Sequence, residues 1–271
     1  MIKLLVTVKI GGSALHTGIP PEFVSDLKRV SSENKTVLVH GGGKEVTDIA
    51  TKMNKEQKFV TSPGGFRSRY TDKETAEIYT MVISGRVNKR LVLALQSEGV
   101  PAVGLSGLDG LLIQAERKKN LIIIDERGRK KIIDGGYTGK ISRISTNLLT
   151  LMLNNGFLPV LAPVAASEEF EPLNVDGDRA AANVAGSLKA DRLVLLTDVG
   201  GVRLNEELVT RMTLSEARDK LKDLGAGMIT KMYAAVEALE MGVSEAIISS
   251  GLGKLPITSA LAREEGTVIT P

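Results

Sequence analysis

The sequence predicts an α/β protein with a mostly parallel central sheet. Short β-branched segments alternate along the chain with segments of helical periodicity. Several of the short segments are apolar at consecutive positions, as expected for strands covered on both faces. The length of 271 residues suits one large domain or two closely fused ones, and 42% hydrophobic with 25% charged residues is typical of a globular chain.

The individual elements follow from these patterns. The predicted strands are Leu4–Ile10, Thr36–His40, Val100–Leu105, Leu121–Asp125, Lys130–Ile133, Leu158–Pro163, Arg192–Thr197 and Glu245–Ser249. The predicted helices are Pro21–Ser31, Lys44–Met53, Asp72–Glu98, Ser145–Asn155, Arg179–Leu188, Leu214–Leu224, Lys231–Met241 and Ser259–Glu264. Between Ala115 and Tyr137 the alternation is interrupted, and two short strands around a basic turn predict a hairpin.

Composition excludes several kinds of function. Without cysteine, the chain has no disulfide, thiolate metal site or cysteine nucleophile, and two histidines argue against a multi-histidine metal site. A net charge of +3, 3% aromatic residues and no tryptophan disfavour a nucleic-acid partner. No apolar segment is long enough to span a bilayer, and Lys9 interrupts the apolar start. We therefore expect a cytoplasmic protein with no membrane or nucleic-acid partner and no metal bound by its own side chains.

Glycine clusters follow the first two predicted strands, at Gly11–Gly12 and Gly41–Gly43. Such turns expose backbone N–H groups, which favours binding of phosphate or carboxylate, although glycines also serve as simple turn residues. Lys9 ends an apolar strand beside the first cluster, where it could meet a phosphoryl group or lie exposed at the strand end. For His40 we predict a structural role in orienting the second turn.

The second half of the chain adds three features. Asp178 precedes the predicted helix Arg179–Leu188, where by itself it suits a helix cap. The apolar strand ending at Thr197 runs into an acidic Gly-Gly turn suited to the sugar or phosphates of a nucleotide. Lys231 is predicted in the first turn of a helix, where its charge opposes the macrodipole and requires an anion such as Asp178 or a phosphate.

Together these motifs resemble the amino acid kinase superfamily, and more closely the N-acetylglutamate kinases. The resemblance runs from about residue 3 to the C-terminus, and five motifs in order carry it: Lys9–Gly12, His40–Gly43, Asn174–Asp178, Thr197–Val202 and Gly227–Lys231. Ser62–Asp72, with its Ser-Arg-Tyr-Thr-Asp ending, departs from ordinary N-acetylglutamate kinases. This segment, with Gly104–Gly110, resembles the kinases that act on amino acids attached to the amino-group carrier protein LysW.

The resemblance implies a fold and an activity. The fold would be a three-layer αβα sandwich forming a single domain over 1–271, with an acyl-acceptor lobe (1–170) and a nucleotide-binding lobe (171–271). The reaction would be ATP-dependent phosphorylation of the side-chain carboxylate of aminoadipate or glutamate on LysW, giving an acyl phosphate in lysine or arginine biosynthesis. The alternative is phosphorylation of free N-acetylglutamate. Cofactors would be ATP and Mg²⁺, with the ion carried by the ATP phosphates, and the helix Asp72–Glu98 would form a homodimer.

Roles for single residues also come from the resemblance. Lys9 and Lys231 would flank the transferring phosphoryl group, Asp178 would hold both lysines, and Gly12 would donate its N–H to the same group. The acceptor would be bound by Gly42, Gly43, Arg69 and Asn174. ATP would be bound by Thr197, Asp198, Gly201 and Val202.

Arg67 competes with Arg69 for the role of carboxylate partner. Counting from Gly65 favours Arg67, whereas counting back from the start of the next helix at Asp72 favours Arg69, which we choose. Basic residues gather around this segment and would steer an acidic carrier, or would simply form a solvated surface. They are Arg67, Arg69, Lys73, Arg86, Lys89 and Arg90.

Overall fold

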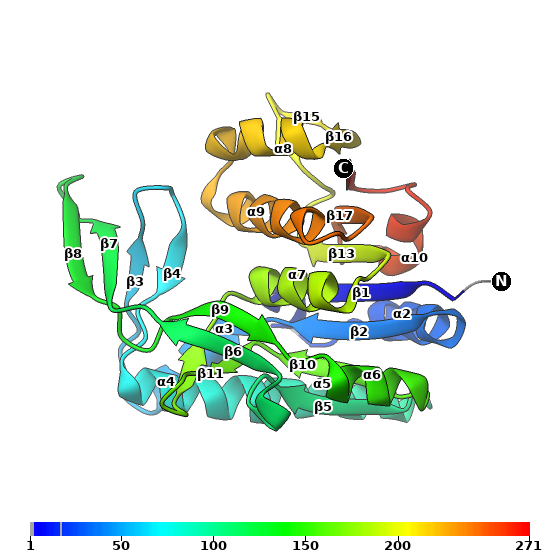
Figure 1. Ribbon diagram of the computed structural model, residues 1–271, viewed down its shortest axis with the longest axis horizontal. Helices are drawn as coiled ribbons and strands as arrows, with labels where there is room; N and C mark the ends of the chain where they lie inside the picture. The colour runs from blue at the N-terminus through cyan, green and yellow to red at the C-terminus, as the bar shows by residue number, and fades with distance from the viewer. Residues whose placement is uncertain (1–2, 17) are drawn as a thin grey trace.

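The computed structural model describes residues 3–16 and 18–271, which form a three-layer αβα sandwich around an eight-stranded sheet (Figure 1). Every neighbouring pair in this sheet is parallel except β17 with β18. The predicted fold class is therefore confirmed. In spatial order the strands are β16 (Arg211–Thr213), β18 (Thr267–Thr270), β17 (Glu245–Ser250), β13 (Arg192–Thr197), β1 (Leu5–Ile10), β2 (Lys35–His40), β10 (Leu158–Ala162) and β5 (Ala102–Ser106).

Alternation along the strands divides the core between the two faces of the sheet. Val8 of β1 packs on one face with Phe23 and Ile78 from the first helix layer, and Val39 of β2 packs on the other with Ala181 and Met232 from the second. The first layer contains α2 (Pro21–Glu33), α3 (Gly43–Lys52), α4 (Lys73–Thr80), α5 (Asn88–Ser97) and α10 (Pro256–Leu261). The second contains α6 (Asn147–Asn154), α7 (Gly177–Leu188), α8 (Leu214–Lys220) and α9 (Ala226–Glu240).

The predicted helix Asp72–Glu98 spans α4, a π-helical segment η1 (Met81–Val87) and α5. Asp72 caps it, because its side chain accepts a hydrogen bond from the Thr75 N–H. The prediction gave the extent correctly and missed the π turn, which side-chain periodicity does not reveal. The last predicted helix is shifted, since α10 begins at Pro256 rather than Ser259.

Smaller elements lie outside the central sheet. The predicted hairpin is confirmed as β7 (Asn120–Ile124) paired with β8 (Lys130–Asp134). Three others were not predicted: a four-stranded sheet, the β3–β4 hairpin, and a short hairpin of β14 (Arg203–Leu204) with β15 (Glu207–Leu208). The four-stranded sheet consists of β12 (Pro172–Asn174), β11 (Val164–Ala166), β6 (Ile113–Arg117) and β9 (Gly139–Ile144).

The β3–β4 hairpin joins β3 (Phe59–Thr61) to β4 (Arg67–Arg69). It stands beside the β7–β8 hairpin at one end of the molecule, and the two are in contact (Figure 1).

Register in the central sheet gathers the glycine turns at one edge. Ile10 lies opposite His40 of β2 and Leu196 of β13, so three neighbouring parallel strands end side by side. Their turns meet at the carboxyl edge of the sheet, which is where open α/β sheets bind ligands. The fold therefore brings the motifs of both halves of the chain to one place.

Candidate active site

A buried carboxylate between two ammonium groups forms the centre of the site. Lys9 Nζ lies 2.5 Å from Asp178 Oδ1, and Lys231 Nζ lies 3.2 Å from Asp178 Oδ2. Burial by itself raises the pKa of Asp178, but the two lysines outweigh it and hold the pKa at about 2. The carboxylate is thus ionised at neutral pH and holds two cations, from strand β1 and helix α9, close together.

The structure corrects the local context of these residues. Asp178 does not cap helix α7, because the cap is Asp176, whose Oδ1 accepts a hydrogen bond from the Arg179 N–H at 2.9 Å. Asp178 lies in the first turn instead, free to face the lysines. Helix α9 begins at Ala226, so Lys231 lies in its second turn rather than its first, and Asp178 is the anion that its charge requires.

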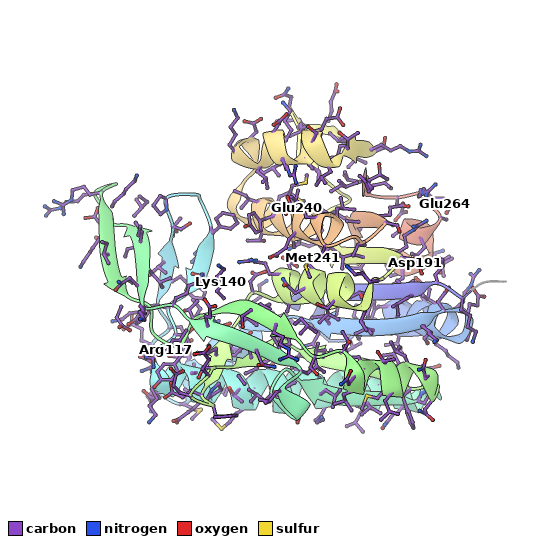
Figure 2. The ribbon with its side chains drawn as sticks, viewed as in Figure 1. Arg117, Lys140, Asp191, Glu240, Met241 and Glu264 are labelled. Carbon is purple, nitrogen blue, oxygen red and sulfur yellow. The ribbon has the colours of Figure 1, made fainter. Side chains whose placement is uncertain are left out.

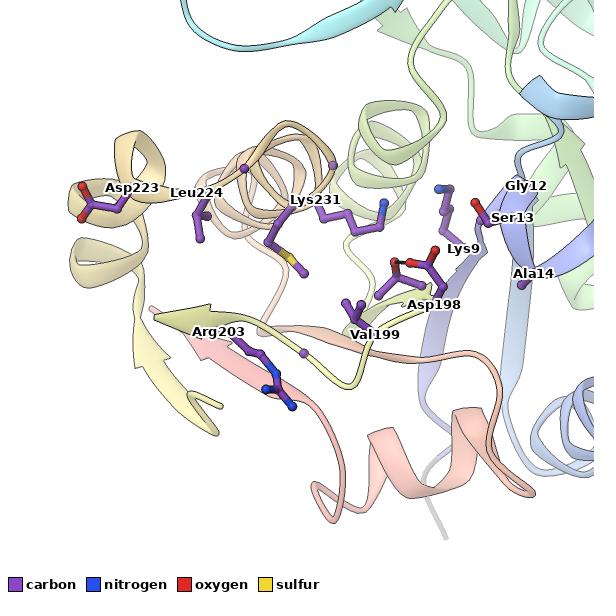
Figure 3. A pocket seen from close by; sticks show the side chains of 16 residues that line it. Lys9, Gly12, Ser13, Ala14, Asp198, Val199, Arg203, Asp223, Leu224 and Lys231 are labelled. Atoms are coloured by element: carbon purple, nitrogen blue, oxygen red, sulfur yellow. Dashed lines mark hydrogen bonds between the residues drawn. The ribbon is translucent and has the colours of Figure 1, made fainter. Parts of the chain in front are cut away.

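A cavity of about 500 Å³ adjoins the lysine pair, a volume typical of small-molecule sites. Lys9 and Lys231 point into it from opposite sides (Figure 3). Its walls come from the first glycine turn, the turn after β13 and the start of α9. The lining residues are Lys9, Gly11, Gly12, Ser13, Ala14, Thr197, Asp198, Val199, Gly201, Arg203, Asp223, Leu224, Gly225, Gly227, Met228 and Lys231.

Three of the four residues predicted to bind nucleotide line this cavity: Thr197, Asp198 and Gly201. The Thr197 hydroxyl donates to Asp198 Oδ1 at 3.1 Å. Val202 does not reach the cavity, because its side chain is fully buried and its N–H donates to Thr267 Oγ1 at 2.8 Å. The sequence reasoning missed the apolar lining by Leu224 and Met228, which nothing in their local pattern distinguishes from core residues.

The two N-terminal glycine turns are in direct contact. A Cβ on Gly12 would lie 2.6 Å from the Gly42 nitrogen, and a Cβ on Gly41 would lie 2.7 Å from the Gly12 nitrogen. Gly42 also has a φ of +154°, which side-chain-bearing residues rarely adopt. Glycine is therefore required here for the close backbone approach of the two turns, and the first of them lines the cavity beside the lysine pair.

His40 is fully buried behind the second turn. Its Nδ1 lies 2.9 Å from the Gly41 carbonyl oxygen, and its Nε2 lies 3.1 Å from Asn88 Nδ2. Burial lowers the pKa of His40 to about 4, so the ring is neutral at pH 7, donates from Nδ1 and accepts at Nε2. These contacts agree with the structural role predicted from the sequence.

The residues predicted to bind the acceptor lie together on another side of the glycine turns. Arg69 is 7% exposed and donates from Nη2 to the Gly43 carbonyl at 2.6 Å and to Thr47 Oγ1 at 3.0 Å, while Nη1 donates to Gln57 Oε1. Asn174 donates to Thr71 Oγ1 at 2.9 Å. Gly42, Gly43, Arg69 and Asn174 are absent from the lining of the 500 Å³ cavity.

Arg67 and Arg69 differ in their surroundings. Both guanidinium groups lie over the Phe59 ring, at 4.8 and 4.9 Å from its centroid. Arg67 is exposed, whereas Arg69 is tied to the second glycine turn through Gly43. Position beside the turn therefore favours Arg69 as the residue nearer an acceptor.

Part of the predicted basic cluster is engaged in contacts within the protein. Arg86 Nε and Arg90 Nη1 both pair with Glu45, at 3.1 and 2.5 Å, and Lys89 donates to the Gly104 carbonyl at 3.0 Å. Arg86 and Arg90 therefore fix helix α3 against the long helix, which weakens the prediction that they attract a carrier.

Comparison with known proteins identifies the family. The model of the amino acid kinase family matches residues 5–250. The chain belongs to this family. An amino acid kinase relative from Cenarchaeum symbiosum is 52% identical over 265 residues, covering 98% of this chain and 99% of that protein. The LysW-aminoadipate/LysW-glutamate kinase of Sulfolobus acidocaldarius is 46% identical over 266 residues, covering 98% and 100%. This chain is therefore a phosphotransferase.

A solved structure supports the same fold. The N-acetylglutamate synthase of Neisseria gonorrhoeae, in complex with coenzyme A and N-acetyl-glutamate, superimposes with a TM-score of 0.81 at 25% identity. The superposition covers 99% of this amino acid kinase and 59% of the synthase chain.

The described residues contain neither a helix suited to crossing a membrane nor a cluster suited to holding a metal ion. Over residues 3–16 and 18–271, no helix has both the length and the apolar composition needed to cross a bilayer. Within the same residues, His, Asp and Glu side chains nowhere gather in groups of three or more that could hold a metal ion.

Proposed function

We propose that this kinase uses ATP to phosphorylate the side-chain carboxylate of an aminoadipate or glutamate residue carried by LysW. The name of the Sulfolobus acidocaldarius relative, at 46% identity over nearly the whole of both chains, supports this substrate. The product would be an acyl phosphate and ADP: an acceptor carboxylate oxygen bonds to the γ-phosphorus, and the bond from that phosphorus to the β–γ bridging oxygen breaks.

The observation that carries the proposal is the pair of ammonium groups held on Asp178 at the edge of the cavity. A carboxylate is already a nucleophile, so the reaction needs no general base. It needs positioning and neutralisation of the charge that develops on the phosphoryl oxygens. Lys9 and Lys231 would supply that charge from two sides, and the Gly12 N–H would donate to the same group.

ATP would occupy the 500 Å³ cavity, with its phosphates at the lysine pair and its base toward Leu224 and Met228. Thr197, Asp198 and Gly201 would contact the nucleotide, whereas Val202 would act only from the core. Mg²⁺ bound to the phosphates would supply further charge neutralisation. The cavity fits an ion carried by the nucleotide, because the Asp178 carboxylate is occupied by the lysines and Asp198 accepts from Thr197.

The acceptor would bind at Gly42, Gly43, Arg69 and Asn174, across the glycine turns from the nucleotide. A carboxylate suits the Arg69 guanidinium, which can present two parallel N–H donors. An acidic carrier would meet exposed cations on the same side of the molecule. Arg67 lies on β4, and Lys140 on β9 projects near the hairpins (Figure 2).

We include a homodimer in the proposal. The long helix exposes Met81 and Leu93, at 56% and 66%, and β5 forms an edge of the central sheet. An apolar helix surface beside an open sheet edge suits pairing with a second copy. Light scattering on a sizing column would measure the mass, and Leu93→Glu is expected to shift a dimer toward monomer; a monomeric wild type would refute this point.

A coupled assay of ADP release tests the reaction. The enzyme would be offered LysW carrying aminoadipate, LysW carrying glutamate, and free N-acetylglutamate. We expect kcat/KM on at least one carrier conjugate to exceed that on the free compound by about 100-fold or more, because the free compound lacks the carrier contacts. Equal turnover of free N-acetylglutamate would establish the alternative, an acetylglutamate kinase.

A further inference from the structure

The tip of the β3–β4 hairpin touches helix α9 through an aromatic pair. Phe66, in the turn of the hairpin, and Tyr233 of α9 have ring centroids 5.7 Å apart and planes at 88°, an edge-to-face arrangement. The two residues are 167 positions apart in sequence (233 minus 66) and come from the two halves of the chain. Aromatic residues are scarce here, with five Phe, four Tyr and no Trp, so the meeting of two of them at an exposed hairpin tip is a specific feature.

Each partner is held in place by its own surroundings. In the hairpin turn, Gly65 has a φ of +81° and the Phe66 N–H donates to Ser62 Oγ at 3.2 Å, which fixes the backbone that carries the Phe66 side chain. On α9, the Arg179 guanidinium lies 5.2 Å from the centroid of the Tyr233 ring. Arg179 is itself fixed by a bidentate pair with Glu237, at 2.6 and 3.0 Å.

The two elements joined by this pair carry opposite sides of the site. The hairpin ends in Arg69, which contacts the second glycine turn through the Gly43 carbonyl. Helix α9 carries Lys231 two positions before Tyr233. Figure 1 shows the hairpin standing alongside the end of α9, joined to the rest of the molecule at its base. A displacement of the hairpin tip would therefore separate the acceptor side from the phosphoryl side.

We propose that Phe66 and Tyr233 form an aromatic latch that holds the β3–β4 hairpin against α9 and so positions the acceptor side for transfer. The latch is a positioning device, since neither ring reaches the lysine pair. It rests on the proposed function only for the identity of the acceptor. The closed hairpin is the binding-competent form, so weakening the latch lowers its population and raises the apparent KM for the acceptor by the same factor at most.

The size of the effect follows from the contact. Loss of an edge-to-face aromatic pair is expected to change the equilibrium between the closed and open states of the hairpin by roughly 2- to 10-fold. At saturating concentration the acceptor shifts the hairpin back to its closed state, because it binds that state better. The kcat of each variant is therefore expected to stay within about twofold of the wild-type value. The cavity for ATP is lined by neither Phe66 nor Tyr233, so the KM for ATP is expected to stay unchanged.

A double-mutant cycle tests the latch on the whole protein, with Phe66→Leu, Tyr233→Leu and both together. In the ligand-free enzyme, we expect amide hydrogen exchange over residues 59–69 to rise about 2- to 10-fold in each single variant and no further in the double variant. Tyr233→Phe is the matched control and should behave as wild type, since it keeps the ring over which Arg179 lies. Additive effects in the double variant, or equal effects of Tyr233→Phe and Tyr233→Leu, would overturn the proposal.

Steady-state kinetics on the same variants test the positioning role. The acceptor KM should rise with the exchange rate while kcat does not, and faster exchange with an unchanged acceptor KM would reject that role.

Phe66→Trp adds a second line of evidence, because the chain has no other tryptophan and its emission reports on position 66 alone. We expect emission that shifts to the red when Tyr233→Leu is added; an unshifted spectrum would mean that the tip does not rest on α9. If the wild type phosphorylates none of the acceptors, the proposed function fails, while the exchange and emission experiments still decide the latch.

Discussion

The proposed nucleotide side and the proposed acceptor side of the site differ in how many of their polar side chains already have hydrogen-bond partners within the protein. On the nucleotide side, a cavity of about 500 Å³ stands open beside two lysines held on Asp178. On the acceptor side, Arg69 and Asn174 are occupied by protein partners, and Arg69 is 7% exposed. The proposed nucleotide side is thus already arranged to receive a polyanion. On the proposed acceptor side, a bound acceptor would have to replace hydrogen bonds that Arg69 and Asn174 already make within the protein.

Among the variants considered, Asp178→Asn, which alters the proposed nucleotide side, is expected to cause the largest loss of activity. Without the carboxylate charge, two ammonium groups meet at a neutral amide and repel each other, so neither keeps its position. We expect kcat to fall by about 1,000-fold, as for loss of a preorganised electrostatic group. The measurement is kcat at saturating ATP and acceptor.

Asp176→Asn is the matched control, two residues away. Asn and Asp cap helices about equally well, and Asp176 makes its capping contact through the Arg179 N–H. We expect less than about a tenfold change in kcat. A comparable loss in both variants would mean that the lysine pair is not what Asp178 contributes.

Gly12→Ala tests the contact between the two sides. Its Cβ would lie 2.6 Å from the Gly42 nitrogen and 2.9 Å from the Gly42 Cα, so the turns must separate. Because catalysis depends on sub-ångström positioning, we expect kcat to fall about 100-fold. Gly11→Ala should lose little activity, because its Cβ would lie at ordinary contact distances from the Leu196 oxygen, 3.4 Å, and from Lys9 Nζ, 4.0 Å; similar losses in both variants would refute the contact as the cause.

Arg69→Ala tests the acceptor side alone. We expect the acceptor KM to rise at least about tenfold, since a charge-assisted bidentate contact is lost, with the KM for ATP unchanged. Arg67→Ala is the control, an exposed arginine on the same hairpin that also lies over Phe59. A larger effect from Arg67→Ala would reverse our choice between the two arginines.

The smallest expected effect is on the free energy of unfolding, which should depend on pH through His40. The folded pKa of about 4 lies below the unfolded value of 6.5, so the unfolded state binds a proton that the folded state does not. Stability should therefore fall as the pH drops below about 6.5, by about 1 kcal/mol between about pH 7 and pH 5.5. Urea unfolding at both pH values measures this, and His40→Gln should reduce the dependence of stability on pH.

Sequence reasoning predicted the fold from strand and helix periodicity, and it named the residues that meet at the sheet edge. It misassigned the cap of α7, because Asp176 and Asp178 lie two positions apart and either could begin a helix. It placed Lys231 one turn too early, since Gly225–Thr230 reads as a loop although α9 already begins at Ala226. Helix α9 is stabilised by tertiary packing that local propensity does not encode.

The four-stranded sheet was missed for a different reason. Its strands β11 and β12 are three residues long, and β12 begins with Pro172 and ends with Asn174, residues typical of turns. They pair only because the rest of the fold brings them together. The choice between Arg67 and Arg69 depended in the same way on the side chains packed around the hairpin, which the sequence could indicate only by counting positions.

The central sheet crosses from one half of the chain to the other without a break, because β1 is hydrogen-bonded to β2 on one side and to β13 on the other. The strand that carries Lys9 is therefore hydrogen-bonded on both sides near the middle of the eight-stranded sheet, which the two halves of the chain share. We therefore expect opening and closing during turnover at the periphery, where the β3–β4 hairpin contacts helix α9 through Phe66 and Tyr233.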